Sequence, residues 1–262
     1  MKALNIVSID GIRLDAALHP SVGAARRGTV IQAHGITVDM DEGGIFVRLA
    51  DRLAEVGFSV LRFSFRGHGG SGGTQQGATI AGEMLDLQAA VDAAARADPG
   101  PLSIVAASFG AVAASLSLPY LERQLRGLVL WNPVLDLHRT FADPDLPWGV
   151  ENFGPDGQRQ LGGDGYLLVD GEFRLGRVMF EEMRTYVPLN YFVASRVPAL
   201  VIHGDQDSYV PYDVAKAASA ARPDCDFHTV AGSDHGFDSR ERENEAIAVT
   251  VDWLTRLYAS DP

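Results

Sequence analysis

The chain has 262 residues, of which 46% are hydrophobic and 21% are charged. This composition supplies enough apolar material for a large core, so the chain is not intrinsically disordered. Acidic residues outnumber basic ones by 34 to 22, and the net charge of −12 argues against nucleic acid or an anionic membrane surface as a partner.

The single cysteine, Cys225, cannot form an intramolecular disulfide, and it excludes a zinc site built on several thiolates. Asp10 interrupts the N-terminal segment before an apolar stretch typical of a signal peptide forms. No apolar run approaches the roughly 18 residues of a membrane-spanning helix. We therefore expect a cytoplasmic protein. The sequence leaves its oligomeric state open, and a homodimer is one option.

Short apolar runs alternate along the chain with segments of helical periodicity. The first two runs, 3–9 and 12–18, are separated by Asp10-Gly11, which predicts an antiparallel hairpin. Further strands are predicted over the apolar runs at 29–35, 59–65, 102–108, 127–133, 198–204 and 227–232. Helices are expected over 43–57, 78–97, from the end of 102–108 to about Leu118, and over 241–258. Because the strands are apolar on both faces, we expect a mostly parallel sheet covered by helices on both sides.

The stretch 134–196 interrupts this alternation. Within it we predict a hairpin over 166–176, turning at Asp170-Gly171, and a helix over 177–186. It is either a structural insertion with its own small core or a lid over a site at the carboxyl ends of the strands, where long ordered insertions usually carry function. It also holds nine aromatic residues: Phe141, Trp148, Phe153, Tyr166, Phe173, Phe180, Tyr186, Tyr191 and Phe192.

Three motifs each follow directly on a predicted strand. The segment A-A-S-F-G at 106–110 places Ser108 among small residues where a strand passes into a helix, as a nucleophile elbow requires. Taken alone, a serine there is equally consistent with a helix cap. The second motif is H-G-D-Q-D-S-Y-V-P at 203–211, and the third is G-S-D-H-G-F at 232–237. Their order of serine, acid and histidine is that of the α/β-hydrolase triad.

On these motifs the chain resembles the α/β-hydrolase superfamily over nearly its whole length. Within it, the chain is most similar to bacterial cinnamoyl/feruloyl esterases and serine-aminopeptidase-like hydrolases. The resemblance also rests on A-H-G-I-T at 33–37, on F-S-F-R-G-H-G-G-S-G-G at 63–73 and on the lid-like segment 165–182. It departs from the family pattern at Ala106, which replaces a glycine, and at Arg66, and neither change removes a triad residue.

The resemblance implies an α/β-hydrolase fold with a twisted, mostly parallel sheet of about eight strands. Residues 1–133 and 197–262 then form one core domain, and 134–196 forms a lid. The implied activity is that of a serine hydrolase that needs neither a metal nor another cofactor.

In this reading Ser108 attacks an acyl carbon, and His235 takes its proton and returns it to the leaving group. Asp207 fixes the tautomer of the imidazole. The backbone N–H of Phe109, which follows the nucleophile, is one oxyanion donor, and by the resemblance that of Ile36 is the second.

Two other carboxylates compete with Asp207 for the role of the acid. Asp205 follows the strand end directly, where its carboxylate is suited to bonding local backbone N–H groups. Asp234 adjoins His235 in the sequence, which aligns its carboxylate poorly with the imidazole. Asp207 lies further into the loop and matches the family's position for the acid.

The remaining polar features suggest structural roles. We expect His34, His68 and His203 to hold loop backbone or a strand end. The segment 67–72 fits G-x-G-x-x-G, but it lacks the helix that a dinucleotide site places directly after the third glycine.

The sequence thus predicts cleavage of a carboxylic ester of a small-molecule acyl substrate through an acyl-enzyme. Trp148, Tyr166 and Phe173 of the lid are candidates for substrate contacts. Thioester, lactone, small-amide or peptide hydrolysis and acyl transfer remain open on the same triad. A ligand-binding protein without turnover is the competing class, and it is disfavoured because all three triad residues are present.

Overall fold

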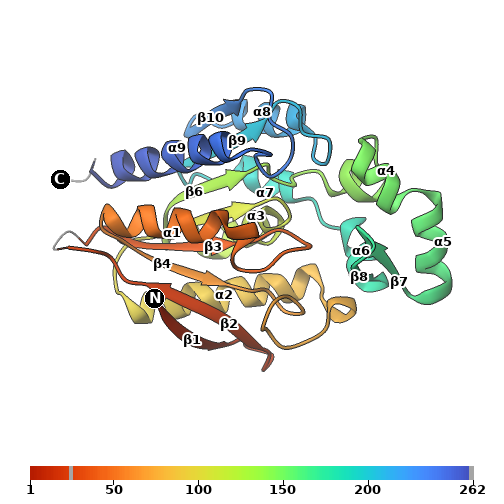
Figure 1. Cartoon of the computed structure of the whole chain (residues 1–262), viewed down its shortest axis with the longest axis horizontal. Coiled ribbons are helices and arrows are strands. Elements are labelled where there is room, and N and C mark those ends of the chain that lie inside the picture. The colour runs from red at the N-terminus through yellow and green to blue at the C-terminus, as the bar shows by residue number, and fades with distance from the viewer. Residues whose placement is uncertain (24–25, 260–262) are drawn as a thin grey trace.

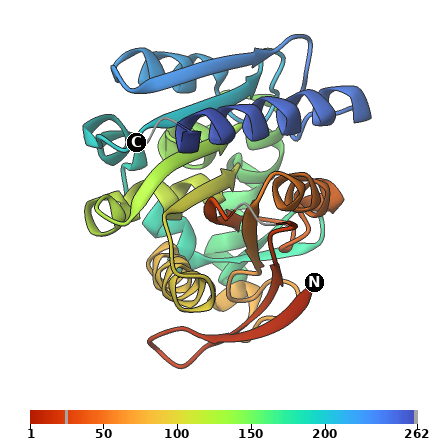
Figure 2. The same cartoon turned by 90° about the vertical axis from the view of Figure 1, so that its left-hand side faces the viewer.

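The structure is a computed structural model that describes residues 1–23 and 26–259. Eight strands of the described chain form one twisted sheet, seen nearly edge-on in Figure 2. In spatial order they are β1 (Lys2–Val7), β2 (Arg13–His19), β4 (Phe58–Phe63), β3 (Gly28–Ala33), β5 (Leu102–Ala107), β6 (Leu125–Trp131), β9 (Ala199–Gly204) and β10 (Cys225–Val230).

The pairing confirms the predicted mixed character of the sheet. β1 and β2 form an antiparallel hairpin that closes at the pair Val7 and Arg13, and β2 is antiparallel to β4. Every later pairing, from β4 through β10, is parallel. The turn of the hairpin contains Gly11 at a φ of 90°, a conformation that glycine adopts without steric cost.

Helices cover both faces of the sheet (Figures 1 and 2). One face carries α1 (Ile45–Glu55) and α9 (Arg240–Ala259). The other carries α2 (Ile80–Ala97), α3 (Gly110–Leu121) and α8 (Tyr212–Ala220). Two short turns, η1 (Glu42–Gly44) and η2 (Gln75–Gly77), lie in the loops that follow β3 and β4.

The alternation of side chains along each strand fills these two layers. On β3, for example, Val30 belongs to the core beneath α1 and α9, whereas Ile31 belongs to the core beneath α2 and α3. Both side chains are fully buried. This explains why the parallel strands read as continuous apolar runs in the sequence.

Residues 147–183 lie beyond the carboxyl ends of the parallel strands, on the right in Figure 1, whereas the helix over 188–194 packs against α3. The predicted hairpin is confirmed, with Asp170 and Gly171 at its turn, and the helix predicted over 177–186 ends at Met183. The elements of the segment 134–196 are η3 (His138–Ala142), α4 (Pro147–Phe153), α5 (Pro155–Asp164), β7 (Tyr166–Val169), β8 (Phe173–Gly176), α6 (Arg177–Met183) and α7 (Pro188–Ala194).

A third hydrophobic cluster joins this segment to the rest of the molecule. Phe141, Trp148 and Phe180 of the segment pack in the same cluster as Ile36 and Phe109 of the core. Glu182 adds a polar contact, since its carboxylate accepts a hydrogen bond of 2.5 Å from the Ile80 N–H at the start of α2. The segment therefore packs against the loops that hold the candidate nucleophile.

The described part of the chain holds no helix that is both long and apolar enough to cross a membrane.

Candidate active site

Ser108 occupies a strained turn between β5 and α3. Its φ of 49° lies in the left-handed region, which costs a non-glycine residue on the order of 1–3 kcal/mol. Two backbone hydrogen bonds hold the turn: the Ser108 N–H donates to the Trp131 carbonyl at 2.8 Å, and the Val134 N–H donates to the Ser108 carbonyl at 3.1 Å. This is the conformation that a nucleophile elbow requires.

The small residues around Ser108 are needed for close packing. A Cβ atom at Gly110 would lie 2.5 Å from the Ala33 carbonyl oxygen and 2.6 Å from that of His34, so only glycine fits there. Ala106, where the family pattern has glycine, is fully buried within β5, and the fold therefore accommodates its methyl group.

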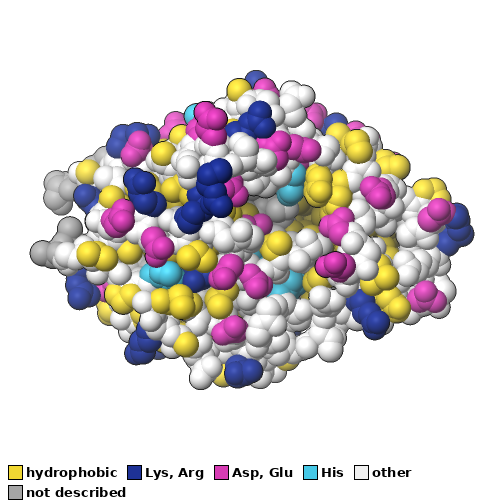
Figure 3. Space-filling view, in the orientation of Figure 1, with side chains coloured by type: hydrophobic (Ala, Val, Ile, Leu, Met, Phe, Trp, Pro, Cys, Tyr) yellow, Lys and Arg dark blue, Asp and Glu magenta, His cyan; other side chains and the backbone are white. Residues whose placement is uncertain are grey.

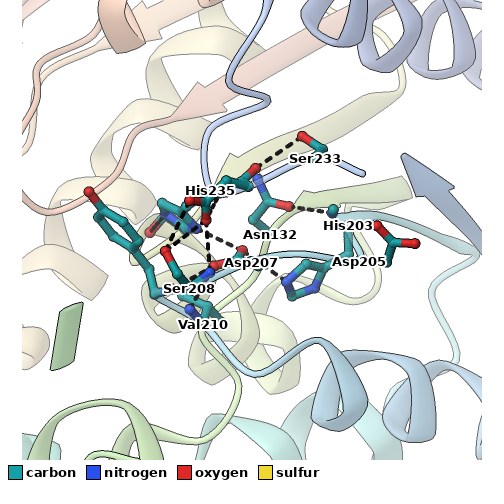
Figure 4. A network of polar contacts seen from close by, with 12 residues as sticks. Asn132, His203, Asp205, Asp207, Ser208, Val210, Ser233 and His235 are labelled. Carbon is teal, nitrogen blue, oxygen red and sulfur yellow. Dashed lines mark hydrogen bonds and ion pairs between the residues drawn. The ribbon is translucent and has the colours of Figure 1, made fainter. Parts of the chain in front are cut away.

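Ser108, His235 and Asp207 form a continuous hydrogen-bonded row, of which His235 and Asp207 are labelled in Figure 4. The Nε2 atom of His235 lies 3.0 Å from the Oγ atom of Ser108, and its Nδ1 atom lies 2.8 Å from the Oδ2 atom of Asp207. The three side chains come from the loops that follow β5, β10 and β9, so the parallel sheet brings them to one edge.

Four donors surround the carboxylate of Asp207. Besides His235, Oδ2 accepts from the Nε2 atom of His203 at 3.0 Å, and Oδ1 accepts from the N–H groups of Tyr209 and Val210 at 2.9 and 2.8 Å. Burial disfavours the ionised form, but His235 and His203 outweigh it and hold the pKa of Asp207 well below its usual range. The carboxylate is therefore ionised and fixed in orientation.

Asp205 and Asp234 hold backbone instead. The Asp205 carboxylate accepts from the Gly232 N–H at 2.6 Å. Asp234 accepts from the Ser208 N–H at 2.8 Å and from the His235 N–H at 2.7 Å, which ties the two loops together. Of the three aspartates considered from the sequence, Asp207 is the one whose carboxylate contacts the imidazole of His235.

Charged neighbours decide the proton affinity of His235. Burial lowers its pKa, but the carboxylates of Asp207, Glu42 and Asp234 outweigh burial, so the net pKa is raised above the ordinary 6.5. Glu42 is itself perturbed, because burial raises its pKa to about 7 in spite of the Gly35 N–H that donates to it at 2.7 Å. Sequence analysis did not single out Glu42, which lies eight positions beyond His34 in a polar loop without a recognisable motif.

Of the two residues expected to supply oxyanion donors, Phe109 directly follows Ser108, and Ile36 lines the same cavity as Ser108. Phe109 stands at the N-cap of α3, where helix N–H groups lack a partner within the helix. The loop carrying Ile36 is held by two buried histidines, since a ring nitrogen of His34 bonds the Gly35 carbonyl at 2.7 Å and one of His68 bonds the Ile36 carbonyl at 2.6 Å. Burial lowers the pKa of both histidines, so each is neutral and supports backbone as expected.

Two cavities open beside Ser108, on the hollowed face in Figure 3. The first, about 230 Å³, lies beneath the segment 134–196, with Phe141, Trp148 and Tyr209 in its wall. The second, about 200 Å³, extends toward α1 and is lined by Trp131 and Phe237 among others. Both reach Ser108, His235 and Glu42, so a molecule spanning the two would pass directly over the serine.

The three aromatic residues suggested as substrate contacts do not lie in one cavity. Trp148 lies in the wall of the first cavity. Phe173 stacks on His68 with ring centroids 4.8 Å apart and lines a separate hollow with Thr37. Tyr166 lies beneath the guanidinium of Arg174, 5.1 Å from ring centroid to Cζ. Tyr209 was missed as a cavity residue, although it stands two positions after Asp207 in the second motif.

A metal site was not expected, and residues 1–23 and 26–259 contain no group of three or more His, Cys, Asp or Glu side chains placed to hold a metal ion.

Comparison with known proteins places the chain among α/β hydrolases. The sequence profile described as serine aminopeptidase, S33 matches residues 24–154, whereas no curated protein sequence gives a significant match. The protein Est1E of Butyrivibrio proteoclasticus, solved with ferulic acid bound, superposes with a TM-score of 0.80 at 23% identity, over 98% of each chain. Mouse α/β hydrolase domain-containing protein 10 superposes with a TM-score of 0.80 at 17% identity, covering 98% of this chain and all of its own. An esterase of Pyrococcus furiosus gives 0.75 at 22% identity, covering 97% of this chain and 90% of its own.

At these identities the structural neighbours establish the fold, which is the predicted α/β-hydrolase fold. The profile match spans half of the chain and includes the strand, elbow and helix around Ser108. The chain belongs to the serine aminopeptidase S33 family of α/β hydrolases.

Proposed function

We propose that the protein is a serine hydrolase that cleaves a carboxylic ester through an acyl-enzyme, with Ser108 as nucleophile, His235 as general base and acid, and Asp207 as the acid of the triad. The observation that carries this proposal is the row of hydrogen bonds from Ser108 through His235 to Asp207, at the junction of two cavities. A serine hydroxyl becomes an effective nucleophile when an adjacent imidazole accepts its proton.

Acylation follows from this geometry. His235 removes the proton from Ser108 as the Oγ atom bonds the acyl carbon, and the carbonyl π electrons move onto the oxygen. The N–H groups of Ile36 and Phe109 stabilise that oxyanion, and Asp207 stabilises the imidazolium. The tetrahedral intermediate then collapses as the ester C–O bond breaks, and His235 gives its proton to the departing alcohol.

Deacylation repeats these steps with water. His235 removes a proton from a water molecule that attacks the acyl carbon, and the second tetrahedral intermediate expels Ser108. The imidazolium returns its proton to the Oγ atom, and the carboxylic acid leaves. The bonds and protons of both half-reactions are accounted for without a metal ion or a redox group.

The first cavity suits an apolar or aromatic acyl group, because Phe141, Trp148 and Tyr209 line it. The solved neighbour Est1E binds ferulic acid, an aromatic acid, which supports this assignment. We assign 134–196 as a lid on a core made of 1–133 and 197–262, because two of these three wall residues, Phe141 and Trp148, come from that segment.

A small aminoacyl amide is the second candidate substrate. The same cavity is lined by the carboxyl groups of Glu42 and Asp170, and its described lining contains no lysine or arginine. A carboxylate in a partly desolvated wall favours a cationic amine over an anionic group. The family's description as serine aminopeptidases also favours this candidate.

A substrate panel combined with an activity probe tests the proposal. Purified protein is assayed on aryl esters, thioesters and aminoacyl amides, and is treated with a fluorophosphonate followed by mass spectrometry of its peptides. We expect the highest kcat/KM on an aryl ester and one modification, on the peptide that contains Ser108. Absence of both turnover and labelling would contradict a serine hydrolase, and preferential cleavage of the amides would replace the ester by the second candidate.

The pH dependence gives a further prediction. His235 must be neutral to accept the serine proton, so kcat/KM should rise with pH, with a midpoint above about 6.5 because the pKa of His235 is raised. Glu42→Gln removes a negative charge that raises this pKa, and the midpoint should therefore move to lower pH. Glutamine keeps an oxygen for the Gly35 N–H, and Glu55→Gln on the exposed face of α1 is the matched control. A midpoint that rises or stays in place would show that Glu42 does not act on His235.

Chelation should leave the activity intact. Since every step above is carried by side chains and backbone of the chain, dialysis against EDTA should retain at least about 80% of kcat/KM, with no stimulation by added divalent ions. Loss of turnover in EDTA, restored by one metal, would contradict the mechanism.

A further inference from the structure

Three aromatic rings form a parallel stack that ends on the candidate general base. The Tyr209 ring lies on the imidazole of His235, with centroids 4.8 Å apart and 7° between the planes. The Trp148 indole lies on Tyr209 at 4.9 Å and 12°. Tyr209 is therefore the ring that contacts both of the others.

Both ends of the stack are fixed by hydrogen bonds. Asp207 holds the imidazole through Oδ2 and accepts from the Tyr209 N–H through Oδ1, so one carboxylate sets the positions of both residues. On the far side, the Nε1–H of Trp148 donates to Asp170 at 2.7 Å, at the turn of the β7–β8 hairpin. The Trp148 backbone N–H also donates to the Ser208 carbonyl at 3.3 Å.

We infer that Tyr209 is a positioning residue that fixes the plane of the His235 imidazole, and that Trp148 supports it from the segment 134–196. This inference rests on the proposed function, in which His235 moves protons. Hydrogen bonds at the two ring nitrogens fix the line that joins them, but they restrict tilt about that line only weakly. The face of Tyr209 supplies the missing restraint, and its π electrons favour the imidazolium that forms during acylation.

The alternative role for Tyr209 is that of a cavity wall, since it also lines the first cavity. A wall residue contributes to substrate binding, so its loss raises KM. A positioning residue contributes to the proton transfer, so its loss lowers kcat and changes the pH dependence. The two roles therefore predict different kinetic changes.

Tyr209→Leu and Tyr209→Phe separate the two roles. We expect Tyr209→Leu to lower kcat by about 10- to 100-fold and to move the midpoint of the pH profile down by about half a pH unit or more. Tyr209→Phe keeps the aromatic face, so it should recover kcat to within about threefold of the wild type and restore the midpoint. The matched control is Phe141→Leu, another wall residue, which should raise KM and leave the midpoint in place. A Tyr209→Leu variant that changes only KM would overturn the inference.

The support from Trp148 is tested by a double-mutant cycle. Trp148→Leu should lower kcat in the same direction but less than Tyr209→Leu. Once Tyr209 is leucine the stack is already broken, so the double variant should be little worse in kcat than Tyr209→Leu alone. Fully additive effects on kcat would remove Trp148 from the inference.

A spectroscopic measurement separates this inference from the proposed function. In Ser108→Ala protein, the ring protons of His235 should resonate upfield of ordinary histidine values, because a stacked phenol ring shields them. The upfield shift should disappear with Tyr209→Leu and persist with Tyr209→Phe, and His235→Asn assigns the signals. Ordinary shifts in the Ser108→Ala protein would overturn the stack even if every Tyr209 variant failed to fold. Failed labelling of wild-type Ser108 would instead overturn the proposed function.

Discussion

Replacement of Ser108 by alanine is expected to lower kcat by a factor on the order of 10³–10⁶ and to abolish labelling by a fluorophosphonate. The variant loses the nucleophile but keeps the cavities and the oxyanion loop, so residual turnover would come from binding and the N–H donors alone. Alanine also carries a Cβ, and the strained φ of 49° should therefore cost no more than it does for serine. The melting temperature should stay within a few degrees of the wild type.

Ser115 provides the matched control for this experiment. It lies on α3, the helix that begins beyond Ser108, and it is fully buried, with a hydroxyl that has no hydrogen-bond partner in the described structure. Ser115→Ala should therefore retain both labelling and turnover. Labelling that persists in Ser108→Ala would show that the elbow assignment is wrong.

The hydrogen-bonded contacts among Ser108, His235 and Asp207 could be anticipated from the sequence, because they depend on local motifs and on a rule of topology. Ser108 directly follows β5, Asp207 and His235 stand a few residues beyond β9 and β10, and the carboxyl ends of parallel strands meet at one edge of a sheet. Their direct contacts then follow from the fold, once the sheet order has placed β5 and β10 on either side of β6 and β9.

The contacts between loops were not predictable in the same way. His203 was expected to be structural, and nothing in its neighbourhood indicated that it would donate to Asp207 together with His235. The stack of Trp148 on Tyr209 joins residues that are far apart in sequence, one at the start of the short helix α4 and one in the loop that follows β9. Such contacts depend on loop conformations that neither periodicity nor turn residues specify.

Some strands and helices end at other residues than the sequence predicted, because side-chain contacts from elsewhere in the fold take the place of the regular backbone hydrogen bonds. The strand predicted over 59–65 ends at Phe63, because the Phe65 N–H bonds the Nε2 atom of His34 and not a neighbouring strand. In the segment 134–196, α4 and α5 are short and begin at prolines, and their few apolar positions gave no helical period to detect.

The acid of the triad is best tested by a pair of matched substitutions. Asp207→Asn should lower kcat by roughly 10⁴, because an amide nitrogen facing His235 favours the wrong tautomer of the imidazole. The same nitrogen also faces the Nε2–H of His203, and the buried donor that loses its acceptor should cost about 1–3 kcal/mol of unfolding free energy. This loss of stability follows from a contact that the sequence did not indicate.

Asp205→Asn is the partner variant. Its side-chain oxygen can still accept from the Gly232 N–H, so the turn beyond β9 should persist, with a loss of at most about 1 kcal/mol. Its kcat should stay within about threefold of the wild type, because the carboxylate bonds backbone at the turn and not the imidazole. The two variants have the same change of charge and nearly the same volume, so the comparison isolates position.

The measurements are kcat, KM and melting temperature for both variants under one set of conditions. We expect Asp207→Asn to be nearly inactive and moderately destabilised, with a KM close to that of the wild type, because Asp207 lies behind the imidazole and outside the walls of both cavities. If Asp205→Asn were instead the inactive and well-folded variant, the acid would be Asp205. The hydrogen bond between Asp207 and His235 would then have only a structural role.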